Sequence, residues 1–333
     1  MDKLNCVVVG VGHLGRHHAR ILASMPNVEL AAVVDTDRKQ GNEIANRHGA
    51  RFLPDLSQLD GTVDAAVVAA PTSEHFRLAS YLLDRGVSVL VEKPITNTVE
   101  QADGLIALAQ ERGAQLHVGH VERFNPAVLA IKKYITQPVY IECDRIASFG
   151  FRCMDVGVVL DLMIHDLDMV LHLTGSEIAQ IDAIGVPVIS KQEDVANARI
   201  RFANGCIASL TASRVAAKRE RKMRVFQADA YFSLDSEAKE AKIYRRPADF
   251  VPPEQIDLSK VDDPRALVFE KMLIAEQIQA EDQEPLRNEL EAFVNCVQTG
   301  SDPQVSGTDG RKAIAAATEI VRQIKQQHWG TEG

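Results

Sequence analysis

The chain has 333 residues, of which 46% are hydrophobic and 25% charged, a globular composition with room for two domains of ~150 residues and not that of a disordered or fibrous protein. The 37 lysines and arginines against 46 acidic residues give a net charge of −9, which argues against a protein that coats nucleic acid or anionic membranes. Five cysteines without a C-x-x-C pair predict reduced thiols. We expect a soluble, cytoplasmic protein, because we find neither a signal-peptide pattern nor a membrane-length apolar run.

The first 120 residues alternate between apolar, β-branched runs and helical patterns. The predicted strands are Leu4–Val9, Val28–Val34, Val63–Ala70, Val87–Val91 and Gln115–Val118. The predicted helices are Leu14–Ser24, Arg38–His48, Ser73–Asp84 and Val99–Arg112. This alternation with short connections predicts right-handed crossovers and a doubly wound parallel sheet of the Rossmann type. We therefore assign residues 1–120 to an α/β domain.

Beyond residue 120, strands follow one another without intervening helices. Asn125-Pro126 is typical of a helix start and predicts a helix to about residue 135. The predicted strands are Val139–Ala147, Ile178–Val186, Asn197–Phe202, Cys206–Leu210, Met223–Leu234 and Ala241–Arg245, with a hairpin turn at Ala203-Asn204-Gly205. We expect an α+β domain over residues 121–333 with an open, largely antiparallel sheet. A surface loop at Arg246–Arg265 and helices near Asn288–Thr299 and Thr308–Gln327 complete it.

A glycine-rich turn between the first predicted strand and helix is the first chemical signal. Its candidate cofactor-binding residues are Gly10, Gly12, His13, Leu14 and Gly15, which fit G-x-G-x-x-G. In this context the glycines allow a tight turn, close approach of a pyrophosphate and close helix packing. Asp35 follows 20 residues after Gly15, where a carboxylate accepts hydrogen bonds from ribose hydroxyls and repels a 2′-phosphate. The pattern favours NAD over NADP; the alternative is a turn that binds nothing.

Two further segments supply candidate catalytic groups. Glu92-Lys93-Pro94 ends a predicted strand, where open α/β sheets bind ligands, although a lysine there is often only a surface residue. In the helix predicted over Asp155–Thr174, one stripe carries Asp161, His165, Asp168 and His172. The helix is apolar nearly all round, so this stripe should face a polar cavity or form an internal network. We expect no metal, because Asp161 and His165 lack obvious further ligands.

Together these segments resemble the Gfo/Idh/MocA oxidoreductase family over nearly the whole chain. The resemblance rests on Gly10–Gly15 continuing into Arg16-His17-His18-Ala19, Ala70-Pro71-Thr72 with His75, Glu92-Lys93-Pro94, Gly119–Pro126, Asp161-x-x-x-His165-x-x-Asp168 and Glu284–Gly310. It implies a Rossmann domain that binds NAD and an α+β domain whose open sheet forms a homodimer or homotetramer. It places Pro71, Thr72, His75 and Glu92 in the cofactor site. It also implies a cis peptide at Lys93–Pro94, with Lys93 near the nicotinamide and Asp161 and His165 on the substrate side.

Alcohol oxidation by such a site needs a hydride acceptor and a base for the hydroxyl proton. An imidazole such as that of His165 titrates near neutral pH and suits the base. Lys93 would stabilise developing alkoxide charge, and Asp161 would orient the substrate hydroxyl or the imidazole. Which of Lys93 and His165 is formally the base remains open.

Two stretches, Val118–Ala127 and Asp155–Asp166, resemble the nucleotide-sugar branch of the family, which oxidises C3 of UDP-N-acetylglucosamine to a ketone that a sugar aminotransferase then consumes. A diphosphate needs cations, and the run Arg214–Arg224 supplies six against one acid. The candidate substrate-binding residues are Lys93, Arg123, Asn125, Arg152, Asp161, Lys218 and Arg221. The basic run could equally be a solvated hairpin or a subunit contact. The alternatives for function are a dehydrogenase of a free cyclitol or hexose and a non-catalytic NAD-binding regulator.

Overall fold

The computed structural model describes residues 3–150, 156–256, 263, 267–268 and 272–327. The chain divides into two compact units, the first made of Met1–Phe124 and Gln283–Ala316 and the second of Asn125–Asp282 and Ala317–Gly333. The first unit thus extends to Phe124, beyond the predicted boundary at residue 120, and it also takes in residues 283–316, which we assigned to the second domain.

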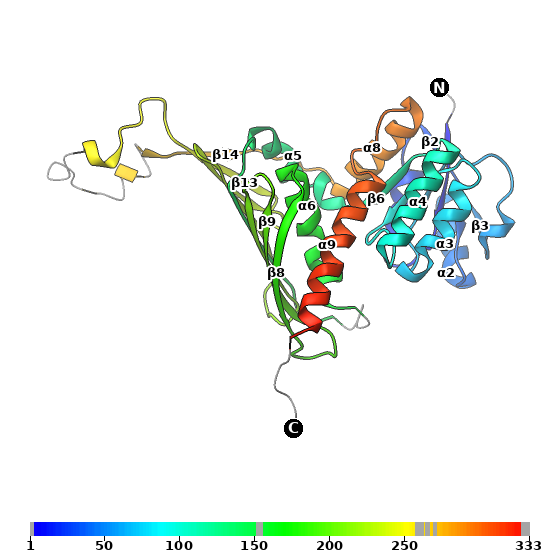
Figure 1. Cartoon of the computed structure of the whole chain (residues 1–333). Helices are drawn as coiled ribbons and strands as arrows, with labels where there is room; N and C mark the ends of the chain where they lie inside the picture. The colour runs from blue at the N-terminus through cyan, green and yellow to red at the C-terminus, as the bar shows by residue number, and fades with distance from the viewer. Residues whose placement is uncertain (1–2, 151–155, 257–262, 264–266, 269–271, 328–333) are drawn as a thin grey trace. The chain divides into compact units, whose positions relative to one another are not determined.

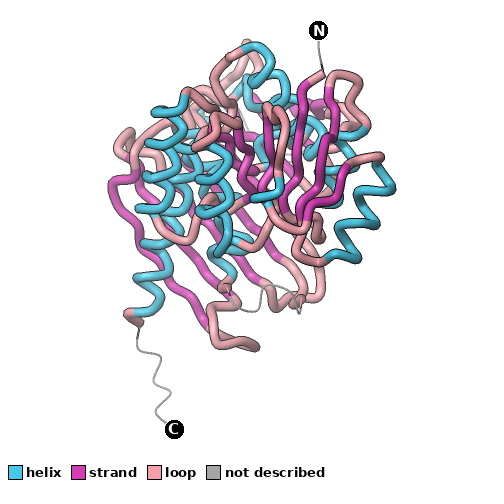
Figure 2. The backbone as a smooth tube through the Cα atoms, turned by 90° about the vertical axis from the view of Figure 1, so that its right-hand side faces the viewer, coloured by secondary structure: helices cyan, strands magenta, loops and turns pink. Residues whose placement is uncertain are grey.

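The first unit contains a six-stranded sheet with the order β3-β2-β1-β4-β5-β6. Its strands, all paired in parallel, are β1 (Leu4–Val9), β2 (Val28–Val34), β3 (Arg51–Leu53), β4 (Ala65–Val68), β5 (Ser88–Glu92) and β6 (Leu116–Gly119). Its helices are α1 (Gly15–Ala23), α2 (Arg38–His48), α3 (Thr72–Leu83), α4 (Val99–Arg112), α8 (Pro285–Thr299) and the first half of α9 (Gly307–Lys325), with 3-10 turns η1 (Leu56–Gln58) and η2 (Val121–Phe124). Helices flank both faces of this sheet (Figures 1 and 2). The doubly wound parallel sheet is confirmed.

Apolar packing explains why a C-terminal segment belongs to the first unit. In α8, Leu290 and Phe293 are buried in the same core cluster as Ile21 and Leu22 of α1. Each fully buried aliphatic or aromatic side chain stabilises the fold by about 1.5–3 kcal/mol. Helix α8 therefore completes the core beneath α1, a tertiary contact that periodicity along the chain does not reveal.

The second unit contains an eight-stranded sheet with the order β14-β13-β12-β11-β7-β10-β9-β8. Its strands are β7 (Tyr140–Ile146), β8 (Ile178–Val186), β9 (Val195–Phe202), β10 (Ile207–Ser213), β11 (Glu220–Phe226), β12 (Ala230–Asp235), β13 (Glu240–Arg245) and β14 (Ile274–Ile278). Its helical elements are α5 (Pro126–Ile131), α6 (Ile164–Thr174), the π-helical turn η4 (Val159–Met163), the 3-10 turns η3 (Lys132–Tyr134) and η5 (Pro253–Gln255), and the end of α9. All strand pairs are antiparallel except β7 with β10, which confirms the largely antiparallel sheet.

Turns between strands explain which strand predictions in this unit were right and which were wrong. Gly205 has φ of 89° between the antiparallel strands β9 and β10, as the Asn-Gly pair predicts. The single strand predicted at Met223–Leu234 is wrong, because Gln227 donates its backbone N–H to Ala230 O and turns the chain between β11 and β12. Strand β14 was not predicted. The loop predicted at Arg246–Arg265 includes η5, and residues 257–262 and 264–265 lie outside the described residues.

The outer edge of β8 is covered by two glutamines of the C-terminal segment. Gln323 accepts the Ala183 N–H at 2.9 Å and donates to Ile181 O at 2.9 Å. One turn later, Gln327 donates to Ala183 O at 2.6 Å and accepts the Gly185 N–H at 3.5 Å. The two carboxamides therefore satisfy backbone groups that a further strand would otherwise bind.

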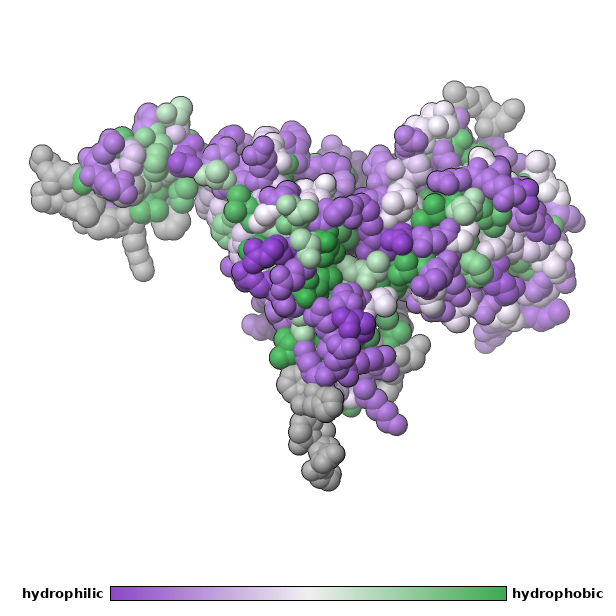
Figure 3. Space-filling model, viewed as in Figure 1, coloured by the Kyte–Doolittle hydropathy of each residue, from purple (hydrophilic) through white to green (hydrophobic). Residues whose placement is uncertain are grey.

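The face of the molecule in view is polar, and the described cysteines are free thiols. The face seen in Figure 3 is mostly hydrophilic, with apolar residues in smaller areas. Cys6, Cys143, Cys206 and Cys296 are free and buried. Burial raises the pKa of the Cys6 thiol to about 12. Within the described part of the chain, no helix has the length and apolar character to cross a bilayer.

A buried histidine on β6 predicts how stability depends on pH. The ring of His117 packs edge-on against Phe293 at 4.8 Å, and burial lowers the pKa of His117 from 6.5 to about 4. Because the unfolded chain binds this proton at higher pH than the folded chain, the stabilisation is present above pH 6.5 and is lost as pH falls toward 4. The wild type should lose about 2 kcal/mol through this group between about pH 7.5 and about pH 5. Urea unfolding of wild type and His117→Phe at both pH values should show a shallower decline in the variant; equal declines would refute the assignment.

Candidate active site

The glycine turn at the carboxyl end of β1 has the geometry that a dinucleotide requires. Gly10 has φ of 83°, and a Cβ there would lie 2.8 Å from Ala69 O. A Cβ at Gly15 would lie 1.7 Å from Gly10 O, so only glycine allows α1 to begin this close to the turn. A Cβ at Gly12 would meet nothing within 4 Å, which leaves the backbone open to a ligand. His13 and Leu14 are exposed at the end of the turn.

A cavity of about 410 Å³ lies beside this turn, at the carboxyl ends of β1, β2 and β4. Among the predicted cofactor residues, Gly10, Gly12, Asp35 and Pro71 line it. Its lining also includes residues that are not among the predicted cofactor-binding residues, such as Gln40, Leu56, Arg77 and Leu78. Those residues come from α2, η1 and α3, and no local motif marks them. Apolar walls, an open glycine backbone and a carboxylate at the end of β2 fit a dinucleotide such as NAD.

Asp35 is held in place by the backbone. Its Oδ2 accepts the Val11 N–H and its Oδ1 accepts the Asp37 N–H, both at 2.8 Å. Each carboxylate oxygen has a second lone pair, so both can still accept a ribose hydroxyl. Asp37 in turn caps α2 by accepting the Lys39 and Gln40 N–H groups. The carboxylate is thus rigidly oriented at the edge of the cavity.

Glu92 and His75 lie at the turn that carries Lys93, at the carboxyl end of β5. Glu92 is buried, and its Oε1 accepts a hydrogen bond from His18 Nε2 at 2.7 Å. Its Oε2 accepts the Lys93 N–H at 3.2 Å. The Lys93–Pro94 peptide is cis, as the family resemblance implies. His75, also buried, has Nδ1 2.9 Å from Pro94 O and Nε2 2.9 Å from Ala70 O. Thr72 begins α3.

In the second unit, the described part of the helix predicted at Asp155–Thr174 differs from a regular α-helix; Asp155 itself lies outside the described residues. It begins with the π-helical turn η4, which contains Asp161, and continues as α6 from Ile164. A π turn changes the angular spacing of side chains and is frequent at functional sites, so the predicted four-residue stripe is not a simple α-helical one. Asp161 and His165 are half-buried, whereas Asp168 is buried. Lys93 belongs to the first unit and these residues to the second.

A buried ion pair fixes the chain beside His165. Arg145 of β7 donates through Nε and Nη2 to the two carboxylate oxygens of Asp166, at 2.9 and 2.8 Å. Both side chains are buried. Such a two-point contact fixes orientation as well as distance. Helix α6 is therefore anchored to the sheet next to the predicted base.

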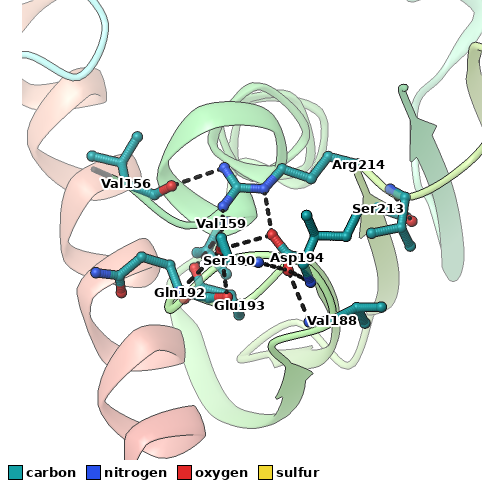
Figure 4. A network of polar contacts seen from close by, with 11 residues as sticks. Val156, Val159, Val188, Ser190, Gln192, Glu193, Asp194, Ser213 and Arg214 are labelled. Carbon is teal, nitrogen blue, oxygen red and sulfur yellow. Dashed lines mark hydrogen bonds and ion pairs between the residues drawn. The ribbon is translucent and has the colours of Figure 1, made fainter. Parts of the chain in front are cut away.

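A second buried ion pair organises the approach to η4 (Figure 4). Arg214, at the end of β10, donates to Asp194 Oδ1 at 2.7 Å, to Val156 O at 2.9 Å and to Ser190 Oγ at 2.9 Å. Asp194 also accepts the backbone N–H groups of Val188, Ile189 and Ser190. Burial alone would raise the pKa of Asp194, but the backbone hydrogen bonds and Arg214 favour the ionised form and lower that pKa.

Glu193, next to Asp194, contacts the start of the helical segment directly. Its backbone oxygen accepts the Val158 N–H at 2.9 Å, and its Oε1 accepts the Val159 N–H at 3.3 Å. A Cβ at Gly157 would lie 1.8 Å from Glu193 Oε1, so the contact requires glycine. A carboxylate at a helix N-terminus satisfies free N–H groups and the helix dipole. The loop between β8 and β9 thus sets where η4 begins.

The remaining residues of the basic run mostly face carboxylates of the same unit. Arg219 and Arg221 each lie 3.4 Å from Glu237, Lys222 lies 3.4 Å from Glu220, and Arg224 lies 3.3 Å from Glu142. Lys218 is exposed. These contacts favour the solvated-hairpin interpretation for much of the run, while leaving Lys218 accessible to a ligand.

Two other predicted substrate residues have structural partners. Arg123 is buried in the first unit, where Nη2 lies 3.3 Å from Asp309 Oδ1. Burial opposes ionisation of Asp309, yet the Arg123 charge and Ser306 lower the pKa of that carboxyl. Asn125 caps α5 by accepting the Ala127 N–H at 3.0 Å and donates to Ser236 O at 3.3 Å. Arg152 lies outside the described residues.

The Arg214 network can be tested by stability. Removing one partner of a buried ion pair leaves the other charge uncompensated, so Arg214→Met should lower the free energy of unfolding by about 3–5 kcal/mol. The matched control is Arg219→Met, whose exposed pair with Glu237 should contribute about 0–1 kcal/mol. Urea unfolding at neutral pH measures both values. Equal, small losses would show that Arg214 does not anchor this segment.

Comparisons with known proteins agree with this architecture. Residues 4–120 match the model described as "Oxidoreductase family, NAD-binding Rossmann fold", and residues 144–232 match the "GFO/IDH/MocA C-terminal domain". The UDP-N-acetylglucosamine 3-dehydrogenase of Acidithiobacillus ferrooxidans is 37% identical, covering 96% of this chain and 97% of that protein. Its solved structure superimposes with a TM-score of 0.86 at 34% identity, covering 98% of this chain and 99% of that one. The scyllo-inositol 2-dehydrogenase (NAD(+)) of Bacillus subtilis is 29% identical over 64% of this chain and 68% of that protein. The chain therefore belongs to the Gfo/Idh/MocA family of NAD-binding oxidoreductases.

Proposed function

We propose that this protein oxidises the C3 hydroxyl of UDP-N-acetylglucosamine to a ketone with NAD as the hydride acceptor. The observation that carries the proposal is the 37% identity, along 97% of its length, to a protein named UDP-N-acetylglucosamine 3-dehydrogenase. The glycine turn, the cavity beside it and the oriented Asp35 carboxylate support the cofactor.

Gly10, Gly12 and Asp35 would hold NAD, which would supply the hydride acceptor for the carbon that carries the hydroxyl. Lys93 donates a hydrogen bond to the reacting oxygen and stabilises its developing negative charge. His165 accepts the hydroxyl proton, and Asp161 orients the substrate hydroxyl or the imidazole. The roles of base and of electrostatic stabiliser could be exchanged between His165 and Lys93. The ion pair of Arg145 with Asp166 supports this assignment because it holds the helix turn that carries His165.

The diphosphate of the substrate needs cationic partners. We propose Lys218, Arg221 and Arg152 for this role, with Arg123 and Asn125 shaping the substrate side. Lys218 is exposed, and Arg221 contacts Glu237 through a pair that is itself partly exposed, so either can turn toward a phosphate at small cost. Arg123 and Asn125 already have buried partners, which favours a supporting role for them.

A second candidate function is oxidation of a free cyclitol such as an inositol. The observation that favours it is the 29% identity to a scyllo-inositol 2-dehydrogenase. The same catalytic groups would serve that reaction, and a diphosphate site would be unnecessary. The shorter coverage of that relative makes it the weaker candidate.

We further propose a homodimer or homotetramer formed through the sheet of the second unit. Four aromatic rings, from Tyr140, Phe226, Tyr231 and Tyr244, stack across neighbouring strands at 5.7, 4.8 and 5.1 Å on the half-exposed face. An aromatic row of this kind is suited to burial against a second copy.

Buried free thiols support a cytoplasmic location. A 3-keto product is a substrate for a sugar aminotransferase, which we propose as the next enzyme.

Cofactor preference tests the Asp35 assignment. Wild type should bind NADH more tightly than NADPH, and Asp35→Ala should weaken NADH binding by about 10- to 100-fold, because it removes hydrogen bonds to a charged group. Asp37→Ala is the matched control, since that carboxylate caps α2 and should not affect discrimination. Fluorescence titration measures both cofactors. Equal binding of NADH and NADPH by wild type would count against the assignment.

Turnover tests the reaction and its residues. Incubation with NAD and UDP-N-acetylglucosamine should yield NADH and a product lacking two hydrogens by mass spectrometry. Lys93→Met and His165→Asn should lower kcat by about 100-fold or more while changing the NADH Kd by less than about threefold. The exposed Lys132→Met is the control. Turnover of an inositol in place of the nucleotide sugar would favour the second candidate, and full activity of both variants would contradict the catalytic roles.

A further inference from the structure

We propose that His18 and His75 are positioning residues that hold the Lys93 turn from opposite sides. The inference rests on the proposed function of Lys93. Neither histidine has a role in the proposed reaction, and both are buried in the first unit, on α1 and α3. The family resemblance places His75 in the cofactor site, but His75 does not line the dinucleotide cavity, so we propose a positioning role for it instead. One contacts the residue before Lys93 and the other contacts the residue after it. The backbone at Lys93 is therefore fixed on both sides.

The contact before Lys93 runs through the Glu92 carboxylate. An ionised carboxylate has no proton to donate and only accepts hydrogen bonds. His18 Nε2 is therefore the donor to Glu92 Oε1, at 2.7 Å. Its Oε2 accepts the backbone N–H of Lys93 itself. A single carboxylate thus connects α1 to the amide of the candidate catalytic lysine. Such a charge-assisted contact is stronger than a neutral one.

The surroundings of Glu92 keep this carboxylate ionised and immobile. Burial alone would raise the pKa of Glu92, but the His18 hydrogen bond, together with the His18 and Lys93 charges, outweighs burial and lowers that pKa. On the adjacent strand, a Cβ at Gly119 would lie 3.1 Å from the carboxylate carbon. Gly119 therefore leaves just enough room for the Glu92 side chain, which has little freedom to reorient.

The contact after Lys93 runs through the ring of His75. Its two nitrogens face Pro94 O and Ala70 O, each at 2.9 Å. Carbonyl oxygens only accept, so a ring nitrogen that carries a proton donates to the oxygen that it faces. The ring then ties the turn after β5 to the chain segment after β4, which borders the dinucleotide cavity. This fixes the Lys93 turn relative to that cavity.

A positioning role predicts a defect in turnover and not in cofactor affinity. Displacing a catalytic group by about 1 Å can cost on the order of 100-fold in rate. We expect His18→Phe and His75→Phe, which keep a ring but lose the donors, to lower kcat about 10- to 100-fold. The NADH Kd should stay within about threefold of wild type. His18→Gln and His75→Gln, which retain an N–H donor, should recover part of the loss and serve if a Phe variant does not fold. His17→Phe, one residue along α1 and half-exposed, is the matched control.

A second measurement tests the hydrogen bond of the Lys93 amide directly and needs no substrate. In hydrogen–deuterium exchange of the full-length protein, the Lys93 amide should exchange at least about tenfold faster in His18→Phe than in wild type or the His17 control, because its acceptor Glu92 is released. His18→Gln, which keeps a donor to Glu92, should show a smaller increase. Faster exchange together with reduced kcat supports the inference. Unchanged exchange overturns it, whether or not UDP-N-acetylglucosamine is turned over. Faster exchange with normal kcat, where Lys93→Met abolishes turnover, also overturns it and leaves the proposed function intact. If Lys93→Met retains full activity, the proposed role of Lys93 fails, and this inference fails with it.

Discussion

A charge removed from water needs a partner, and this chain meets that requirement beside each of its candidate catalytic residues. Glu92, which precedes Lys93, is matched by His18. Asp166, which follows His165, is matched by Arg145. Asp194, in the loop that sets the start of the π-helical turn, is matched by Arg214. Breaking such a pair is costly because the remaining charge stays buried. The same interactions that satisfy burial therefore also fix the chain beside the candidate catalytic residues.

Much of the fold could be predicted from local pattern. Leu4–Val9, Val28–Val34, Arg38–His48 and Ile178–Val186 have the predicted bounds, because continuous apolar runs and helical periodicity are strong signals over such lengths. The edge strands β3 and β14 were missed. Arg51–Leu53 has only three residues, and edge strands carry a weak apolar signal. The return of α8 to the first unit depends on Phe293 packing in a distant core, which no local pattern encodes.

In the candidate site, too, some residues could be predicted from local pattern and others could not. The glycine turn and Asp35 were found because a dinucleotide imposes a fixed spacing on the chain. The partners of buried charges could not be found, since Glu92 lies 74 residues from His18 and Arg214 lies 20 residues from Asp194. The basic run at Arg214–Arg224 shows why a missing partner matters. In the sequence Arg214 belongs to a run of cations that could bind a diphosphate, whereas in the fold it is an internal anchor with three acceptors. Charge in a sequence shows that a partner is required, but not which one.

The two glutamines that cover the outer edge of β8 also determine how the protein tolerates loss of its C-terminal segment. Gln323 and Gln327 occupy backbone groups of residues 181–185 that a free sheet edge would present. A chain shortened before Gln323 would uncover a row of donors and acceptors flanked by the exposed apolar side chains of Ile184 and Val186. An edge of this kind recruits strands from other molecules, and intermolecular β-sheet growth is the usual result. The last turn of α9, together with Gln327 just after it, therefore protects this edge although both lie outside the two sheets.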